Sequence, residues 1–356
     1  MATREYRGLA YRNNADLAAW LAKRPAEKAL EPGLPIIDPH HHLWHTEARG
    51  RYFLPELLAD LNGGEGGSGH NVVSTVFLEC QAMFRASGPE AMKPVGEIEF
   101  VVGQAAQMAS GQYGKTRVCE GIIGWVDLTL GGRVREVLEA EIAAAGGRFR
   151  GVRYGTSWDE GLAGKFVSRA MTPHRLLDAK LREGFAVLGK MGLTFDSWHF
   201  HPQLPDLIDL ARAFPDQTII CDHVGGALGV GQYAGKQAEV TAEWKKSIAE
   251  LAKCPNVNMK LGGLGMTSFG FGFEFESAPP SSEKLAETWR PYIETCIEAF
   301  GANRCMFESN FPPDKQSCGY TELWNAFKHL TKNASADEKR TLYSGTAARV
   351  YKLHAP

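Results

Sequence analysis

Short runs of apolar and β-branched residues alternate along this chain with longer amphipathic stretches rich in Ala, Leu, Glu and Lys. The short runs are typical of buried strands, and the long ones have the periodicity of helices. We predict strands at 35–38, 72–79, 120–128, 149–154, 193–198, 218–222, 257–261 and 304–308. We predict helices near 94–110, 132–145, 174–190, 203–214, 240–253, 285–300 and 320–331, with a weaker one at 55–61. Eight strands that are nearly all followed by a helix indicate an α/β fold, a single (β/α)8 TIM barrel, because parallel strands need crossover connections.

The segments outside this repeat are an N-terminal arm and three loops. We predict a partly helical arm at 1–34, with its helix near 14–30, and one barrel domain at 35–356. Two positions are open for the arm: across the bottom of its own barrel, or on a neighbouring copy in a homo-oligomer. Glycine- and serine-rich composition indicates loops at 62–69, 225–235 and 262–280. The last two follow strands six and seven, at the face where barrels build active sites, and the length of the last predicts a substrate lid.

Composition and charge exclude several classes of protein. With 39 Lys and Arg against 41 Asp and Glu, the net charge is −2, so no basic surplus is present to bind nucleic acid. No apolar run approaches the ~20 residues of a membrane span, and the charged N-terminus is unlike a signal peptide. Seven scattered cysteines without a CxxC pair fit a reducing compartment, so we expect a cytoplasmic protein. The chain contains neither a phosphate-binding loop nor a dinucleotide fingerprint, and we expect no nucleotide cofactor.

Histidines collect at the ends of three predicted strands. His40 and His42 end the first strand in IIDPHHHLW, and their spacing places both on one face of an extended segment. Two imidazoles so placed can bind one divalent ion. His223 ends strand six in CDHVGG, ahead of two glycines that free the backbone. His199 and His201 end strand five, and either can face the barrel interior.

Carboxylates and an amide end two other strands. Glu308 and Asn310 lie at the mouth of strand eight in RCMFESNFP, where burying a charge is costly unless it is used. Glu79 ends strand two and is a candidate metal ligand or acid.

Four further residues are candidates for substrate binding. Arg150 and Arg153 bracket strand four, and a guanidinium matches a carboxylate in a bidentate way, although a surface salt bridge explains them equally well. Lys260 ends strand seven as either an anion contact or a lysine that extends its stem along apolar surface. Trp198 is a candidate wall for a ring-shaped ligand.

Four of these segments together resemble a known family. DPHHHLW, FDSWHFHPQLPDLIDLARAFP, CDHVGG and RCMFESNFP look like the amidohydrolase superfamily, over about residues 35–351. The branch they resemble is the amidohydrolase-2 type, which contains 2-pyrone-4,6-dicarboxylate lactonase and sugar lactonases. The resemblance implies that His40 and His42 are metal or substrate ligands, that His223 is the sixth-strand histidine and that His199 is the fifth-strand residue. It also implies a divalent metal, zinc or manganese, and arginines near strand four for substrate carboxylates.

The chain departs from this family at strand eight. The family usually has Gly-(Ser/Thr)-Asp before an aromatic residue and proline, whereas this chain has Glu308, Ser309 and Asn310. An amide cannot act as a general base. Either Glu308 supplies the carboxylate, or Asn310 only positions water or substrate. The departure leaves open whether a metal is required, because some lactonases of this branch work without one.

These features together predict a hydrolase with a small-molecule substrate. We expect water to open a lactone of a carboxylated or ring-containing organic acid. His223 would polarise the carbonyl or shuttle a proton, Glu308 would serve as base and then acid, and Arg153 would hold the substrate. One alternative is a metal-dependent decarboxylase of an aromatic or unsaturated acid on the same barrel. The other is a barrel that binds a ligand without catalysis.

Overall fold

The computed structural model describes residues 6–8, 11–47, 49–63, 69–169 and 171–356, with eight parallel strands at its centre. The spatial order of the strands equals their chain order: β1 (Ile36–His41), β4 (Val72–Leu78), β5 (Arg117–Gly124), β6 (Phe149–Gly155), β7 (Thr194–Trp198), β8 (Ile219–Cys221), β9 (Val257–Leu261) and β10 (Cys305–Phe307). The last strand lies beside the first, and just beyond it the backbone N–H of Asn310 donates to the His40 carbonyl at 2.9 Å. The strands therefore form a nearly closed barrel, as predicted.

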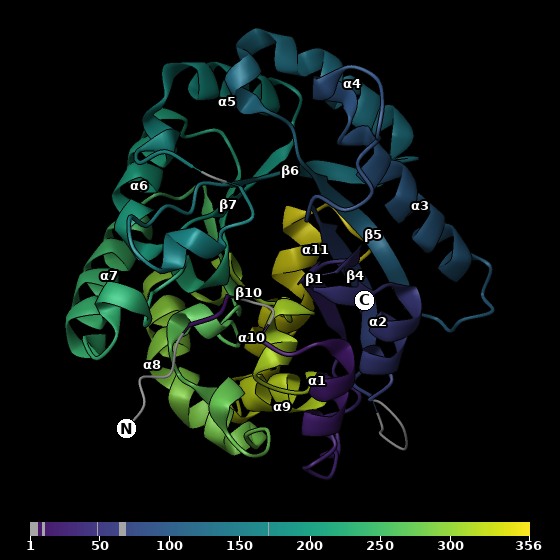
Figure 1. Ribbon diagram of the computed structural model, residues 1–356, viewed down its shortest axis with the longest axis vertical. Coiled ribbons are helices and arrows are strands. Elements are labelled where there is room, and N and C mark those ends of the chain that lie inside the picture. The colour runs from purple at the N-terminus through teal and green to yellow at the C-terminus, as the bar shows by residue number, and fades with distance from the viewer. Residues whose placement is uncertain (1–5, 9–10, 48, 64–68, 170) are drawn as a thin grey trace.

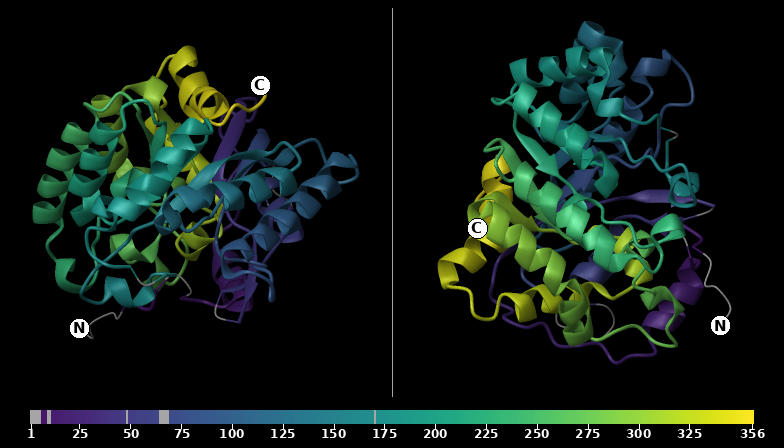
Figure 2. Two further views of the ribbon diagram at one scale, coloured as in Figure 1. Left: turned by 90° about the horizontal axis from the view of Figure 1, so that it is seen from above. Right: turned by 90° about the vertical axis from the view of Figure 1, so that its left-hand side faces the viewer.

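Helices surround the barrel (Figures 1 and 2). They are α2 (Leu54–Leu61), α3 (Val95–Ala109), α4 (Val134–Ala144), α5 (Ala179–Lys190), α6 (Leu204–Ala213), α7 (Gln237–Leu251), α8 (Ser282–Phe300) and α9 (Tyr320–Leu330), one after each strand. Two short helices, α10 (Ala336–Arg340) and α11 (Thr346–Val350), follow at the C-terminal end, and a small hairpin of β2 (Trp44–Thr46) and β3 (Gly50–Tyr52) follows β1. Among the described residues, no helix is long and apolar enough to span a membrane.

Alternate strand residues separate the core into two layers. On β9, Val257, Met259 and Leu261 pack toward the helices, whereas Lys260 points into the barrel. A small apolar cluster fills part of the interior, with Ile37, Ile220 and Met306 among its members, and Tyr351 beyond α11 packs against it. The same interior carries ionisable groups that belong to the candidate site.

Three predicted boundaries differ from the structure for local reasons. The third strand spans Arg117–Gly124 and not 120–128, because Asp127 caps a 3-10 turn by accepting the Thr129 amide at 3.0 Å. Helix α5 begins at Ala179 and not at 174, because Asp178 caps it. The arm helix α1 (Asn14–Leu21) is shorter than the predicted 14–30, and Pro25 follows its end.

The arm lies at the end of its own barrel where the strands terminate, so the predicted position across the barrel bottom is wrong. Trp20 donates its indole N–H to the Glu276 carbonyl at 2.8 Å, in the segment between β9 and α8. Farther along, the Leu30 amide donates to the Asn325 side chain on α9 at 2.8 Å.

The segment predicted as a lid is a packed wall in this structure. Residues 262–269 are buried, and Thr267 donates to the Gly8 carbonyl of the arm at 2.8 Å. The other predicted loop at 62–69 lies mostly outside the described residues, because 64–68 are not described.

The hydrogen bonds of Glu120 on β5 predict that the free energy of unfolding falls in acid. Burial raises the pKa of Glu120, but hydrogen bonds from Ser74, His354 and Arg117 outweigh it and lower the pKa to about 2. A carboxyl with a lowered folded-state pKa stabilises the fold above its unfolded pKa and loses that contribution as pH falls. Glu120→Gln should therefore cost about 1–2 kcal/mol of unfolding free energy at pH 7, after allowance for solvent screening.

Urea unfolding from pH 7 to pH 2 measures this effect. The difference between wild type and Glu120→Gln should shrink between about pH 4.5 and pH 2. Exposed Glu298 provides the matched control, and Glu298→Gln should change little at any pH. If the difference in unfolding free energy between wild type and Glu120→Gln does not change with pH, the lowered pKa of Glu120 is contradicted.

Candidate active site

A recess of about 80 Å³ opens between the C-terminal ends of the strands. Six residues predicted from the sequence line it: His42, Glu79, Arg153, Trp198, His223 and Asn310. Trp44, Arg49, Arg169 and Met266 line it as well. This is the position expected for a barrel active site.

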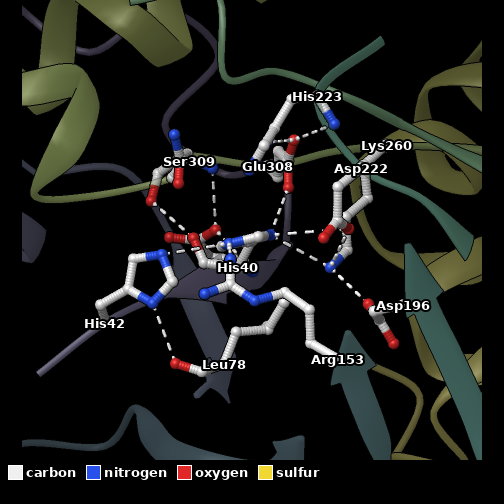
Figure 3. Close-up of polar contacts among 12 residues, drawn as sticks. His40, His42, Leu78, Arg153, Asp196, Asp222, His223, Lys260, Glu308 and Ser309 are labelled. Carbon is white, nitrogen blue, oxygen red and sulfur yellow. Dashed lines mark hydrogen bonds and ion pairs between the residues drawn. The ribbon is translucent and has the colours of Figure 1, made fainter. Parts of the chain in front are cut away.

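His40 and His42 face one another beneath the recess (Figure 3). Their Nε2 atoms are 3.2 Å apart, and Nδ1 of His42 donates to the Leu78 carbonyl at 2.9 Å. That hydrogen bond leaves the lone pair of His42 on Nε2. Burial lowers the pKa values of both imidazoles well below their ordinary value, so both are neutral.

Glu308 lies between His223 and His40 and contacts both rings (Figure 3). Its Oε1 lies 2.7 Å from Nδ1 of His223 and accepts the His223 backbone N–H at 3.2 Å, while Oε2 lies 2.8 Å from Nδ1 of His40. Burial raises the pKa of Glu308 to about 8 and lowers that of His223 to about 3. Because Nδ1 of His223 donates to Glu308, Nε2 of His223 keeps its lone pair on the recess side.

The backbone around His223 is strained to hold this orientation. His223 and the β-branched Val224 have φ values of 55° and 48°, in the left-handed region that non-glycine residues rarely adopt. Gly263 on the neighbouring loop makes room, because a Cβ there would lie 2.5 Å from the His223 side chain. The Trp198 ring packs against His223 with centroids 4.7 Å apart.

Lys260 lies beside Asp222 with its amine turned toward His40 (Figure 3), and it is not among the residues that line the recess. It is fully buried, and its Nζ lies 2.7 Å from Asp196, 3.1 Å from Asp222 and 3.2 Å from Nδ1 of His40. Burial lowers the pKa of Lys260, but the carboxylates around it outweigh burial and raise it. The predicted substrate contact at Lys260 is therefore wrong, and the lysine neutralises buried acids.

Two arginines enclose Glu79. Arg153 donates Nε to Oε1 of Glu79 at 3.0 Å, and Arg169 donates to Oε2 at 3.3 Å. Both carboxylate oxygens are thus occupied, which does not favour Glu79 as a metal ligand. The Nη1 of Arg153 lies 3.4 Å from Nε2 of His40, so its charge borders the histidine pair.

Two groups of side chains have the chemistry to hold a divalent metal. The Nε2 atoms of His40 and His42 are separated by about the distance that two nitrogens have on one tetrahedral zinc with Zn–N bonds of about 2.0–2.1 Å. His40, Asp222 and His223 present ligand atoms that all lie within 4.8 Å of one another. Lys260 lies 3.1 Å from Asp222 and 3.2 Å from Nδ1 of His40, and Arg153 lies 3.4 Å from Nε2 of His40. His40 belongs to both groups, and the separation of its Nε2 from that of His42 fits two ligands on one zinc.

A family profile described as amidohydrolase matches residues 37–353, nearly the whole chain. The chain belongs to the amidohydrolase family. The resemblance inferred from the sequence motifs is confirmed.

Several relatives align along most of this amidohydrolase. The protein y4mH of Sinorhizobium fredii is 29% identical over 340 residues, which cover 89% of this chain and 98% of the relative. An L-fucono-1,5-lactonase of Burkholderia multivorans is 25% identical over 337 residues, covering 90% and 97%. The crystal structure of a Burkholderia multivorans amidohydrolase with bound zinc shares the fold, with a TM-score of 0.66 and 23% identity over 90% of this chain and 99% of the other.

Three predicted residues of the amidohydrolase lie away from the recess. Arg150 is at the opposite end of β6, where it donates to the Gly147 carbonyl at 2.8 Å, so its predicted substrate role is wrong. His201 turns to the outer side, where Nδ1 accepts the Leu228 amide at 3.3 Å. His199 is fully buried beside Ser197, and burial lowers its pKa to about 3.

The two predicted residues that follow β10 lie at different depths. Asn310 lines the recess, and its side-chain amide donates to Oδ1 of Asp314 at 2.6 Å. Glu308 lies behind the histidines with no exposed surface. The prediction that Glu308 itself handles protons at the reacting water does not fit this placement.

The sequence interpretation missed Arg169 and Asp222. Asp222 directly precedes His223 in CDHVGG, so its position at a strand end was a usable signal. Arg169 lies in the loop after β6, where no strand periodicity indicates a direction for its side chain.

Proposed function

We propose that this amidohydrolase opens a lactone by water attack, with the barrel of residues 35–356 carrying the reaction and residues 1–34 as an added arm. The observation that carries the proposal is the pair of His223 and Glu308. A neutral imidazole whose Nδ1 is held by a buried carboxyl, and whose Nε2 is free in a recess, is the arrangement of a general base. The lactonase among the relatives supports the same reaction.

His223 moves the protons in this proposal. Its Nε2 takes a proton from water as the water oxygen bonds to the lactone carbonyl carbon and the carbonyl electron pair moves to oxygen. Collapse of the tetrahedral intermediate breaks the ring C–O bond, and the leaving alkoxide takes the proton from His223. The product is one hydroxy acid. Glu308 acts as a positioning residue that holds Nδ1 of the imidazole while Nε2 takes the proton.

Arg153 supports the charge that develops on the carbonyl oxygen. It lines the recess and is held by Glu79, so its guanidinium is already oriented when the oxyanion forms. Among the described residues that line the recess are three arginines, Arg49, Arg153 and Arg169, and one carboxylate, that of Glu79. We propose from this imbalance that the substrate carries a carboxylate, with Trp44 and Trp198 as walls for its ring.

His40 and His42 are the residues that would hold a divalent metal in this proposal. A bound metal of this kind lowers the pKa of water to about 7 and polarises a carbonyl. The zinc in the Burkholderia multivorans amidohydrolase supports zinc as the ion.

A lactone panel in a pH-stat tests the reaction. We expect base uptake equal to the hydroxy acid formed, no carbon dioxide, and faster turnover of carboxylated rings than of neutral ones. Pretreatment with a chelator should lower turnover, and added zinc should restore it. Release of carbon dioxide without base uptake would instead identify a decarboxylase. Ligand binding without any turnover would identify a non-catalytic barrel.

A further inference from the structure

A second and larger cleft lies beside the recess. Its volume is about 700 Å³, within the range of small-molecule sites. It is lined by α1 of the arm, the β2–β3 hairpin, α2 and the start of α9. Figure 1 shows α1, α2 and α9 in the lower part of the molecule. The family profile begins at residue 37, so the arm wall of this cleft is an addition to the matched barrel.

Trp44 and Arg49 are shared by the cleft and the recess. The Trp44 ring stacks on His42 with centroids 5.5 Å apart, and the Arg49 guanidinium lies 4.9 Å from the Trp44 ring. The turn after β10 borders both spaces, with Pro313 in the recess and Pro312 in the cleft. A ligand in the cleft therefore lies one aromatic ring away from His42.

The sizes of the two spaces differ in a way that bears on the substrate. The recess of about 80 Å³ suits a single small ring, whereas the cleft of about 700 Å³ accepts a much larger group. A long substituent on the lactone exceeds the recess, and the cleft beside Trp44 has room for it.

The described lining of the cleft carries four cations against three carboxyl groups, Glu56, Asp60 and Glu322, and this small excess favours an anionic group. Two of its cations already have carboxylate partners, Arg51 with Glu56 at 2.6 Å and Lys315 with Asp60 at 2.7 Å. Among the described residues, Arg49 and Arg24 have no carboxylate within 4.0 Å. Within the part of the chain that the structure describes, Arg49 donates one side-chain hydrogen bond, to Ser168 at 2.8 Å. Trp44 is buried, and its indole N–H has no hydrogen-bond partner among the described residues.

We propose that the cleft is a distal subsite that binds an anionic substituent of the lactone, with Trp44 as the platform and Arg49 as the anchor. The proposal rests on the proposed lactonase function and specifies its substrate class: a lactone ring with a side chain that ends in a carboxylate. The arm thus contributes to specificity, because α1 closes the side of the cleft opposite the barrel.

Two synthetic lactones test the subsite: an unsubstituted six-membered lactone and the same ring with a carboxyalkyl chain of about six carbons. Arg49→Gln should raise KM for the carboxyalkyl lactone by about 10- to 100-fold more than KM for the unsubstituted lactone, the range expected for loss of a charged hydrogen bond. Ala22→Trp, at an exposed cleft position, should also raise KM for the carboxyalkyl lactone only. Lys23→Gln, on the exposed arm outside the cleft lining, is the matched control and should match wild type.

An equal rise in KM for both lactones in Arg49→Gln would overturn the subsite, because Arg49 would then act on the lactone ring in the recess. An unchanged KM for the carboxyalkyl lactone in both variants would also overturn it.

A binding measurement separates failure of the subsite from failure of the proposed function. Calorimetry with the ring-opened carboxyalkyl hydroxy acid needs no turnover. Tighter binding to wild type and Lys23→Gln than to Arg49→Gln supports the subsite, and equal affinity overturns it. If wild type hydrolyses neither lactone but shows this binding difference, the lactonase proposal fails while the anion subsite stands.

Discussion

Replacing His223 by asparagine should lower kcat for lactone opening by about 10²–10⁴-fold, the usual contribution of a positioned general base. The asparagine amide can still donate to Glu308, which lies 2.7 Å from Nδ1 of the histidine, so the fold should be preserved. It has no basic nitrogen, and no proton can be taken from water. Steady-state kinetics combined with a thermal melt measures both expectations.

His201→Asn is the matched control for this variant. His201 also follows a strand end, but it does not line the recess, and asparagine can accept the Leu228 amide in its place. We expect kcat close to that of wild type. If His223→Asn turns over the lactone at the wild-type rate, the assignment of the base is wrong.

Replacing Lys260 by methionine should destabilise the protein by about 3–5 kcal/mol, the cost of leaving buried charges without their partner. Asp196 and Asp222 are both fully buried, and Lys260 lies 2.7 and 3.1 Å from them. Methionine matches the length of the lysine stem but supplies no charge. Chemical denaturation at pH 7 measures the loss.

Lys253→Met provides the comparison for Lys260. Its ammonium group is largely exposed and pairs with Glu250, so removal of this pair should cost no more than about 1 kcal/mol. Adding Asp196→Asn to Lys260→Met should recover part of the stability, because one of the uncompensated charges is removed. A Lys260→Met protein as stable as the Lys253→Met protein would show that the buried pair contributes little.

The local pattern of the chain predicts the barrel for a physical reason. Parallel strands in a barrel are buried on both faces and each needs a crossover helix, so apolar runs and amphipathic stretches alternate visibly along the sequence. The ends of strands and helices were less well predicted, because a single cap such as Asp127 or Asp178 moves an element boundary by several residues.

Side-chain alternation correctly indicates which strand-end residues lie close together, but not how deep each one lies. His42, Arg153 and His223 line the recess as their strand-end positions indicate. Glu308 and Lys260 were equally plausible at the recess, yet both are fully buried beneath it. Depth depends on which partners from distant strands neutralise or orient a group, and these contacts join residues far apart in the chain.

By itself, the sequence determined the eightfold barrel, the histidine pair on the first strand and the histidine of the sixth, because local periodicity and spacing encode these features. Only the tertiary structure decided that Glu308 orients His223 from behind, that Arg150 lies at the opposite end of its strand and that the arm walls a second cleft. Each of those outcomes depends on long-range packing, where the cost of burying a charge selects the partner, and no local pattern records that choice.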